Sequence, residues 1–401
     1  MQKLYIMFCY IEDVGGGQIY VNSKVPWLEE AGWDVIVFSP LTERSDSIVP
    51  WTNLTKFAAN KVEGLNKSPE FWSKKKMKAV LEQLQSKCSG EYSEIIIESH
   101  TDYFAEWGEL LAEKLNAKNI CYLLDEQLEL YGAKEFLYFK YRRNEVAGIT
   151  DSSVERLFTG YAPLIKENNH KLSASHSSQA EEYYWDAIEK IQRCDWNIGY
   201  VGRSKQYVDN ITKNIAIFAD RHPDKTINVV ILGEILDLRI LEDKKNVICT
   251  KLGFKFPIPK SFFRKLDVAI AGAGSATLCC REHVPTIVAD AGTTNAAGIL
   301  GYTVSSSIFN PESDRTYCEW LEDILVDKKL EKMKQIYEMP KIDVNKVYQE
   351  HMEFIYNSEQ RHEYFDFIAH PQKNYTFEDK IKYFLKRTFP GLYKAYKLKR
   401  G

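Results

Sequence analysis

The sequence predicts two α/β domains in series, each of the Rossmann-like, doubly wound type. Short apolar runs alternate with amphipathic helical segments in both halves, which indicates parallel sheets with right-handed crossovers. The alternation breaks once, around residues 170–192, and then restarts. The 401 residues are enough for about two to three domains. We expect domains over residues 1–175 and 195–345, a polar linker over 176–194, and a helical, basic tail over 346–401.

The first half begins with an apolar run over Leu4–Tyr10, as expected of a strand that is buried on both faces. Further strands are expected at Asp34–Phe38, Ile95–Ile97 and Ile120–Leu124. Helices are expected at Ile19–Ala31, which Gly32 closes, and near Phe104–Leu115.

The second half repeats the pattern. The expected strands are Trp196–Val201, Ile227–Leu232, Val247–Thr250, Val268–Ala271 and Thr286–Ala289. A helix is expected over Val208–Asp220, between the first two of these strands. Together the two halves give two sheets in series.

Composition narrows the function classes. Lys and Arg number 53 and Asp and Glu 56, which argues against a nucleic-acid binder that works through its overall charge. The eight cysteines are scattered without a CxxC pair, so we expect reduced cytosolic thiols rather than disulfides or a zinc site. Residues 1–8 lack the order of a signal peptide, and no apolar run reaches about 18 residues, so we expect a cytoplasmic protein with no spanning segment.

A glycine run follows the first strand and is the first candidate ligand site. Consecutive glycines, including Gly16 and Gly17, let backbone N–H groups approach a ligand. A dinucleotide fingerprint would need a third glycine where Tyr20 stands and an acid where Ser39-Pro40 ends the second strand, which argues against NAD here. A tight turn without ligand is the alternative.

Two basic residues form the second candidate. Arg203 and Lys205 follow the strand that opens the second domain, at the carboxyl end where α/β proteins bind ligands. A diphosphate is the natural partner for two such charges. The alternative is a solvated basic turn.

The third candidate is the turn Gly272–Thr277, which follows an aspartate-led strand and opens a short helix. Free N–H groups and the helix dipole make such a terminus an anion site, with Ser275 and Thr277 as further donors. A capped structural helix is one alternative. A loose dinucleotide fingerprint, with Asp290 as its acid, is another.

These elements occur in the order found in GT-B glycosyltransferases, which the chain resembles over roughly residues 1–345, especially the family 4 (group 1) type of bacterial surface polysaccharide synthesis. The resemblance lies in the glycine run, the Val201-Gly202-Arg203-x-Lys205 segment, and the aspartate-led strand with its later Val284-Pro285. It implies two Rossmann-like domains facing across a cleft. The second would bind the sugar nucleotide and the first the acceptor.

The resemblance also implies roles for single residues. Arg203 and Lys205 would hold the diphosphate, and Gly233 and Glu234 would lie near the base. The diphosphate would also be cradled by Gly274, Ser275, Ala276 and Thr277.

The family's paired glutamates are absent from this sequence. The second would stand at Leu278, seven residues before the proline. Glu282, one turn further along the helix, would reach the ribose or else be a surface acid. The turn resembles those of inverting members that use lipid acceptors, so the stereochemical outcome stays open.

Acid/base candidates come from the first domain. His100 follows the Ile95–Ile97 strand, at the end where a ligand would bind; a hydrogen-bonded structural histidine is the alternative. Asp13 suits an inverting base, or else caps the turn beside the glycine run. Asp125-Glu126 rank third.

Two segments predict contact with an anionic membrane. Residues 371–401 hold nine basic residues against two acidic ones. Lys74–Lys78 follows Phe71 and Trp72, a pairing of lysines with aromatic rings that favours the headgroup layer. Solvated lysine faces are the alternative for both.

The sequence thus predicts a hexosyltransferase, cytoplasmic and peripheral at the membrane. It would move a sugar from a nucleotide-diphosphate donor to a glycan, or polyprenyl-linked glycan, of capsule, exopolysaccharide or O-antigen. No metal or other cofactor is expected, because cationic side chains and helix N–H groups offset the diphosphate charge. A sugar-nucleotide epimerase of the same fold and a non-catalytic glycan-assembly protein remain alternatives, and an NAD oxidoreductase is a third.

Overall fold

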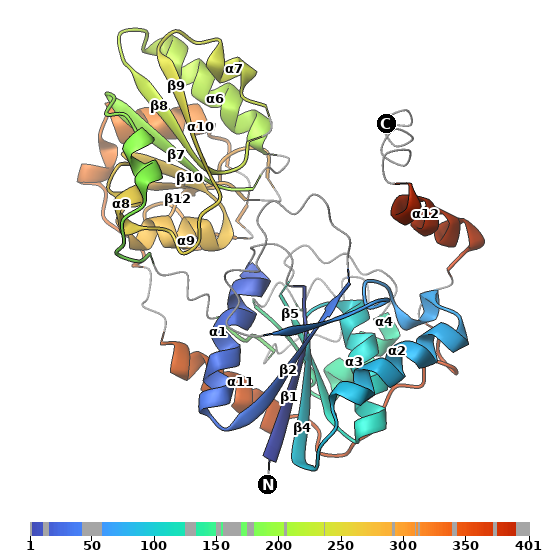
Figure 1. The fold of residues 1–401 in the computed structure, drawn as a ribbon. Helices are drawn as coiled ribbons and strands as arrows, with labels where there is room; N and C mark the ends of the chain where they lie inside the picture. The colour runs from blue at the N-terminus through green and yellow to red at the C-terminus, as the bar shows by residue number, and fades with distance from the viewer. Residues whose placement is uncertain are drawn as a thin grey trace. The chain divides into compact units, whose positions relative to one another are not determined.

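The structure is a computed structural model, and its chain clusters into two compact units, Met1–Ser177 with Ile342–Gly401, and Ser178–Lys341 (Figure 1). The first is called unit 1 and the second unit 2. The structure describes residues 2–10, 16–41, 58–124, 134–149, 154, 170–174, 180–203, 207–235, 237–290, 293–308, 310–311, 313–338, 343–371 and 375–389.

Unit 1 is built on a six-stranded parallel sheet in the order β3-β2-β1-β4-β5-β6. Its strands are β1 (Gln2–Phe8), β2 (Trp33–Pro40), β3 (Ala59–Val62), β4 (Tyr92–Ser99), β5 (Lys118–Leu123) and β6 (Val146–Gly148). Its helices before unit 2 are α1 (Gly16–Glu30), the 3-10 turn η2 (Pro69–Phe71), α2 (Lys74–Lys87), α3 (Asp102–Leu115) and α4 (Lys134–Arg142).

Strand β1 shows why the first apolar run forms a central strand. Tyr5 and Met7 pack into the cluster under α1, whereas Leu4, Ile6 and Phe8 pack into the cluster that α2 and α3 share. Successive side chains of a strand point to opposite faces, so a run that is apolar throughout fits a sheet covered on both faces.

Unit 2 repeats this design with the sheet order β12-β11-β10-β7-β8-β9, parallel except for the β11–β12 pair. Its strands are β7 (Trp196–Gly202), β8 (Ile227–Gly233), β9 (Val247–Gly253), β10 (Val268–Ala271), β11 (Thr286–Val288) and β12 (Gly298–Ile299). Its helices and turns are η3 (Asp186–Lys190), α6 (Val208–Arg221), α7 (Arg239–Glu242), α8 (Lys260–Phe263), α9 (Ala273–Arg281), α10 (Tyr317–Leu321), η4 (Glu322–Val326) and η5 (Lys329–Lys332).

Both sheets have the Rossmann strand order, in which the third, second and first strands of a unit precede its fourth, fifth and sixth. The predicted fold class of two doubly wound α/β units is therefore confirmed. In such sheets successive strands are added first to one side of the first strand and then to the other. Ligands bind at the carboxyl ends of the strands at this switch point. This point lies between β1 and β4 in unit 1, and between β7 and β10 in unit 2.

The stretch expected to be a linker over 176–194 is different in the structure. Ala180, Ile188 and Ile191 are buried in a core cluster of unit 2, and the Glu181 N–H donates to the Ile258 carbonyl at 3.0 Å. These apolar residues are why the described part, from residue 180 onward, folds as part of unit 2.

The C-terminal segment, expected as a separate tail over 346–401, returns to unit 1 instead. Its helices are α11 (Val344–Tyr356) and α12 (Phe377–Thr388). Helix α11 buries Tyr348 and Ile355 in the cluster under α1, and the Trp27 indole N–H donates to Asn345 at 3.1 Å.

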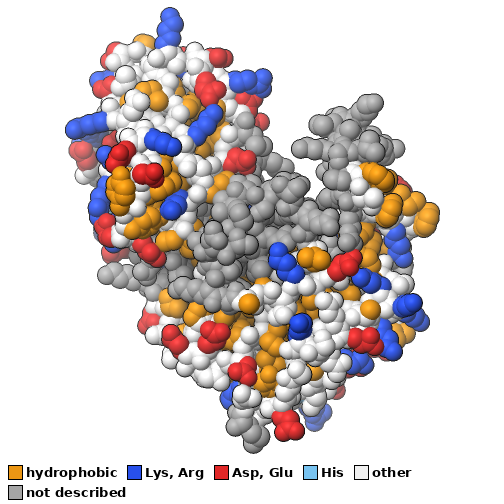
Figure 2. All heavy atoms as spheres, viewed as in Figure 1, with side chains coloured by type: hydrophobic (Ala, Val, Ile, Leu, Met, Phe, Trp, Pro, Cys, Tyr) orange, Lys and Arg blue, Asp and Glu red, His pale blue; other side chains and the backbone are white. Residues whose placement is uncertain are grey.

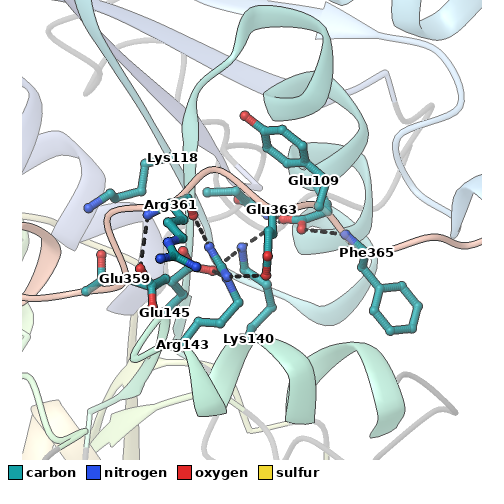
Figure 3. Close-up of polar contacts among 12 residues, drawn as sticks. Glu109, Lys118, Lys140, Arg143, Glu145, Glu359, Arg361, Glu363 and Phe365 are labelled. Carbon is teal, nitrogen blue, oxygen red and sulfur yellow. Dashed lines mark hydrogen bonds and ion pairs between the residues drawn. The ribbon is translucent and has the colours of Figure 1, made fainter.

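The residues after α11 are held by charged side chains of unit 1 (Figure 3). Arg143 donates to the Glu363 carboxylate at 3.1 Å, and the Phe365 N–H donates to Glu109 at 3.1 Å. Glu109 is itself buried and paired with Lys140 at 2.8 Å. The segment therefore completes charge pairs inside unit 1. Among the described helices of both units, none is long and apolar enough to cross a bilayer.

Candidate functional site

The first candidate site lies at the carboxyl edge of the unit 2 sheet, where three neighbouring strands end together. Val201 of β7 pairs with Ala271 of β10, and Gly202 pairs with Gly233 of β8. Arg203, Glu234 and the start of α9 follow these residues directly, so the register brings the three predicted elements to one edge.

Gly233 is required by the backbone itself. Its φ is +123°, and a Cβ atom there would lie 1.8 Å from the Gly202 carbonyl oxygen. The Glu234 N–H donates to the same oxygen at 3.0 Å. This close approach fixes Glu234 beside the turn that carries Arg203.

Helix α9 presents N–H groups at this edge. Its first residue, Ala273, has a φ of +49° and is followed by helical residues, a sequence of conformations that forms an anion-binding concavity. The N–H groups of Gly274 and Ser275 form no hydrogen bond within the described chain, whereas that of Ala276 donates to the Gly272 carbonyl. Two of the four predicted cradle residues thus offer unpaired backbone donors.

The structure places Thr277 and Glu282 differently from the other cradle candidates. The Thr277 hydroxyl is bonded within the chain, 3.1 Å from Ser307 Oγ. Glu282 is the C-cap of α9. A helix rises 1.5 Å per residue, so about 12 Å of backbone separates Glu282 from Gly274. Leu278, where the family has a glutamate, is buried and apolar.

The Arg203 side chain is exposed and makes no ion pair with a described residue. Its carbonyl accepts a hydrogen bond of 2.7 Å from the Tyr200 hydroxyl, which holds the turn. Lys205 lies outside the described residues. A hollow of about 380 Å³ follows Glu234. It is lined by Ile235, Asp237, Leu238, Arg239, Glu242 and Lys251.

The second candidate site lies at the carboxyl edge of the unit 1 sheet, between β1 and β4. Phe8 pairs with Ser99, and the next residue, His100, donates its N–H to the Phe8 carbonyl at 3.3 Å. Helix α1 begins at Gly16 rather than at Ile19, so Gly16 and Gly17 open the helix. Asp13, Asp125 and Glu126 lie outside the described residues.

Packing does not explain why position 17 is a glycine. A Cβ atom there would meet Leu124 Cδ1 at 3.6 Å, an ordinary contact, and its φ is not in the left-handed region. The described chain therefore leaves room for a side chain where the sequence has none.

His100 is buried and has one ring nitrogen without a partner. Its Nε2 lies 2.8 Å from Glu98 Oε1, while no described residue bonds to Nδ1. Because the Glu98 carboxylate accepts, Nε2 carries the proton in the neutral ring, which leaves a lone pair on Nδ1. This is the arrangement of a base that a carboxylate orients.

Glu98 is the centre of a buried polar network. Besides His100, it accepts from Tyr5 at 2.6 Å, from Tyr20 at 2.9 Å and from Lys24 Nζ at 2.5 Å. These four donors use all the lone-pair sites of the carboxylate. Burial raises the pKa of Glu98, but the Lys24 ammonium and the His100 hydrogen bond outweigh it and hold the pKa well below its usual range.

His351 of α11 closes this network from the C-terminal segment. Its Nε2 donates to the Ser173 carbonyl at 2.9 Å, and its Nδ1 lies 3.1 Å from the Tyr20 hydroxyl and 3.4 Å from Lys24 Nζ. Burial, together with the Lys24 charge, lowers the pKa of His351 to about 3. His351 is therefore a neutral acceptor for Lys24.

Sequence reasoning missed Glu98, Lys24 and His351. The signal for Glu98 is a charge inside an apolar strand, two positions from His100 and hence on the same face. Lys24 lies one turn after Tyr20 on the helix stripe that also buries Val21 and Val25.

Comparisons with known proteins bear on the fold. No family model matches the chain, and no curated protein matches its sequence. Among solved structures, Anabaena Alr3699/HepE in complex with UDP has a TM-score of 0.57 and 13% identity, covering 89% of this chain and 100% of that one. A Listeria monocytogenes protein assigned as a UDP-N-acetylglucosamine 2-epimerase has a TM-score of 0.52 and 11% identity, with 91% and 99% covered. Sucrose-phosphate synthase from Thermosynechococcus elongatus has a TM-score of 0.51 and 12% identity, covering 90% of this chain and 95% of that one. These likenesses show that the chain has the GT-B fold.

Proposed function

We propose that this protein is a glycosyltransferase of family 4 type, which moves a hexose from a nucleotide-diphosphate sugar to a glycan. The observation that carries the proposal is His100, a base oriented by Glu98 at the ligand edge of unit 1. Sugar transfer needs either a base at the acceptor hydroxyl or, in a retaining enzyme, polar groups that stabilise the developing charge of the sugar, and His100 suits either role. The leaving group needs an anion site, which unit 2 offers separately.

The donor would bind at the unit 2 edge. Arg203 and the N–H groups of Gly274 and Ser275 would donate to the diphosphate oxygens and stabilise the diphosphate as it leaves. Glu234 and the hollow beside it would lie near the base of the nucleotide. Because these donors offset the negative charge, we expect transfer without added divalent metal.

The acceptor would bind at the unit 1 edge. His100 Nδ1 would take the proton of the attacking hydroxyl, and the Nε2–H bond to Glu98 would stabilise the imidazolium that forms. Asp13 and Asp125-Glu126 remain further candidates for the acid/base role.

The acceptor class we propose is a growing surface glycan, free or polyprenyl-linked, of capsule, exopolysaccharide or O-antigen. The basic residues of 371–401 and Lys74–Lys78 support a cytoplasmic protein that is peripheral at an anionic membrane.

Two variants test the two sites separately. Arg203→Ala should weaken UDP or GDP binding about ten- to one-hundred-fold in isothermal titration, the loss expected for one charge-assisted hydrogen bond. Arg264→Ala removes an exposed arginine of the same unit and should leave the affinity unchanged. Unchanged affinity in Arg203→Ala would reject the donor site.

His100→Asn should lower transfer about a hundred-fold or more while nucleotide binding stays intact, because the base acts on the acceptor alone. The measurement is sugar transfer to a membrane extract or a glycan fraction. Full transfer activity in His100→Asn would show that His100 is not the base.

An epimerase is the second candidate, favoured by the likeness to the Listeria protein. Inversion at a carbon centre breaks a C–H bond, so an epimerase would incorporate deuterium into UDP-N-acetylglucosamine from heavy water without any acceptor. A glycosyltransferase would leave the sugar protons in place. A non-catalytic assembly protein would show neither reaction.

A further inference from the structure

One face of α12 exposes large apolar side chains. Phe377 is 79% exposed and Phe384 59%, and Ile381 and Leu385 are exposed beside them. Their spacing of four, three and one places them on a single stripe of the helix. Figure 2 shows hydrophobic side chains gathered over this helix. We call these four residues the apolar stripe.

The other side of α12 is attached to unit 1 by aromatic rings. The ring centroids of Tyr375 and Tyr383 lie 5.1 and 5.0 Å from that of Phe71, and the Tyr383 centroid lies 5.6 Å from that of Trp72. All three pairs meet edge to face. We call these four residues the aromatic clasp. At 100° per residue, Tyr383 lies about 200° around the helix from Ile381. The clasp therefore turns the apolar stripe away from unit 1.

Basic residues border the stripe. Lys380 flanks it on one side and Lys382 on the other, and both are exposed. Lys382 also pairs with Glu378 of the same helix at 2.8 Å. Helix α2 begins two residues after the clasp residue Trp72, and its exposed Lys74 and Lys75 add two charges near the same surface. In the sequence, residues 386–401 add six basic residues and no acidic one.

We propose that the apolar stripe, together with the lysines of α12 and the start of α2, docks unit 1 onto a bilayer of anionic phospholipids. The stripe would enter the boundary between headgroups and acyl chains while the lysines meet lipid phosphates. The helix of 12 residues is about 18 Å long, too short for a hydrocarbon core of about 30 Å, so it would lie along the surface.

The charges favour a bilayer over a second copy of this chain. Besides the Lys382–Glu378 pair, the surface carries Lys380 and the two lysines at the start of α2. Two copies that met through their stripes would bring these like charges together, which costs free energy, whereas an anionic surface neutralises them. The proposal deepens the proposed function, on which it rests only for its purpose, a membrane-bound acceptor.

The test is co-sedimentation of the full chain with vesicles of phosphatidylcholine, with or without a quarter of phosphatidylglycerol. The protein should bind the anionic vesicles at least ten-fold more tightly than the neutral ones. Phe377→Ser/Phe384→Ser should lose at least ten-fold of this binding. Ile368→Ser, which changes an apolar residue that is 90% exposed outside α12, should bind like the wild type.

Equal binding by the double variant and the wild type would overturn the proposal, as would equal binding to both vesicles. A wild-type dimer that the double variant converts to a monomer, without vesicle binding, would assign the stripe to a second copy. UDP titration of the same samples separates the two proposals. Vesicle binding without UDP binding defeats the proposed function alone, and the reverse defeats the docking surface alone.

Discussion

Replacing Glu98 by glutamine is the sharpest test of the buried network. Lys24 is fully buried, and Glu98 is the carboxylate that balances its charge at 2.5 Å. With glutamine in place, Lys24 would face only neutral groups: the amide, the hydroxyls of Tyr5 and Tyr20, and the ring of His351. Removing one partner of a buried pair costs about 3–5 kcal/mol, so Glu98→Gln should lower the free energy of unfolding of unit 1 by that amount.

The pair, rather than either residue alone, should set this cost. Lys24→Met/Glu98→Gln removes both charges and should recover most of the lost free energy, as a double-mutant cycle would show. Because Glu98 has a depressed pKa, its contribution is present above the pKa that a glutamate has when unfolded, and is lost as pH falls through the folded value. The cycle is therefore measured at neutral pH.

The assay is urea-dependent hydrogen exchange of the β1 and β4 amides in the full chain, read by mass spectrometry, because it reports on unit 1 alone. Glu94→Gln is the matched control. Glu94 is also on β4 and pairs with Lys3 of β1 at 2.9 Å, but the two side chains are 30% and 43% exposed. Its loss should cost about 0–1 kcal/mol. If Glu98→Gln costs no more than this, or if the double variant is as unstable as the sum of the singles, the reasoning is refuted.

Two further predictions concern pH and backbone. His351 stays neutral in the fold, with a pKa of about 3, but takes up a proton below about pH 6.5 when unfolded, so it makes unit 1 less stable as pH falls, by about 2 kcal/mol at pH 5. His351→Gln should reduce the loss of stability between pH 7 and 5, while the exposed His362→Gln should keep it; equal slopes in urea titrations would contradict the buried, neutral ring. Gly233→Ala should strongly destabilise unit 2, because its Cβ would overlap the Gly202 carbonyl, whereas Gly253→Ala, at a φ of +73° with open space around it, should cost about 1 kcal/mol. Equal melting temperatures for these two glycine variants would count against the close approach at Gly233.

The regular part of the fold was predictable because most of its strands are apolar and largely buried. The predicted strand Val268–Ala271 coincides with β10. The other predicted strands differ from the observed ones mainly at their ends. The strands that went unpredicted are at or near the sheet edges. β3 has the sequence Ala-Asn-Lys-Val, β6 has three residues and β12 has two, so none carries a periodic pattern.

The candidate sites were predictable only where local sequence decides them. Arg203 and the start of α9 follow strands directly, so strand order alone brings them to one edge. The closure of the buried network by His351 was not predictable, because His351 lies 331 positions from Tyr20 and only the packing of α11 brings the two together. The same limit applies to Thr277, whose hydroxyl is taken by Ser307, 30 positions away.

The return of α11 to unit 1 has a consequence for how the protein is made. The ribosome completes β1 to β6 about 200 residues before it releases Tyr348, Met352 and Ile355, which finish the hydrophobic cluster over α1. Until then Lys24 and Glu98 lack the cover of α11 while unit 2 is still being translated. A stop codon before residue 343 would therefore release a protein whose N-terminal half stays open and prone to chaperone capture.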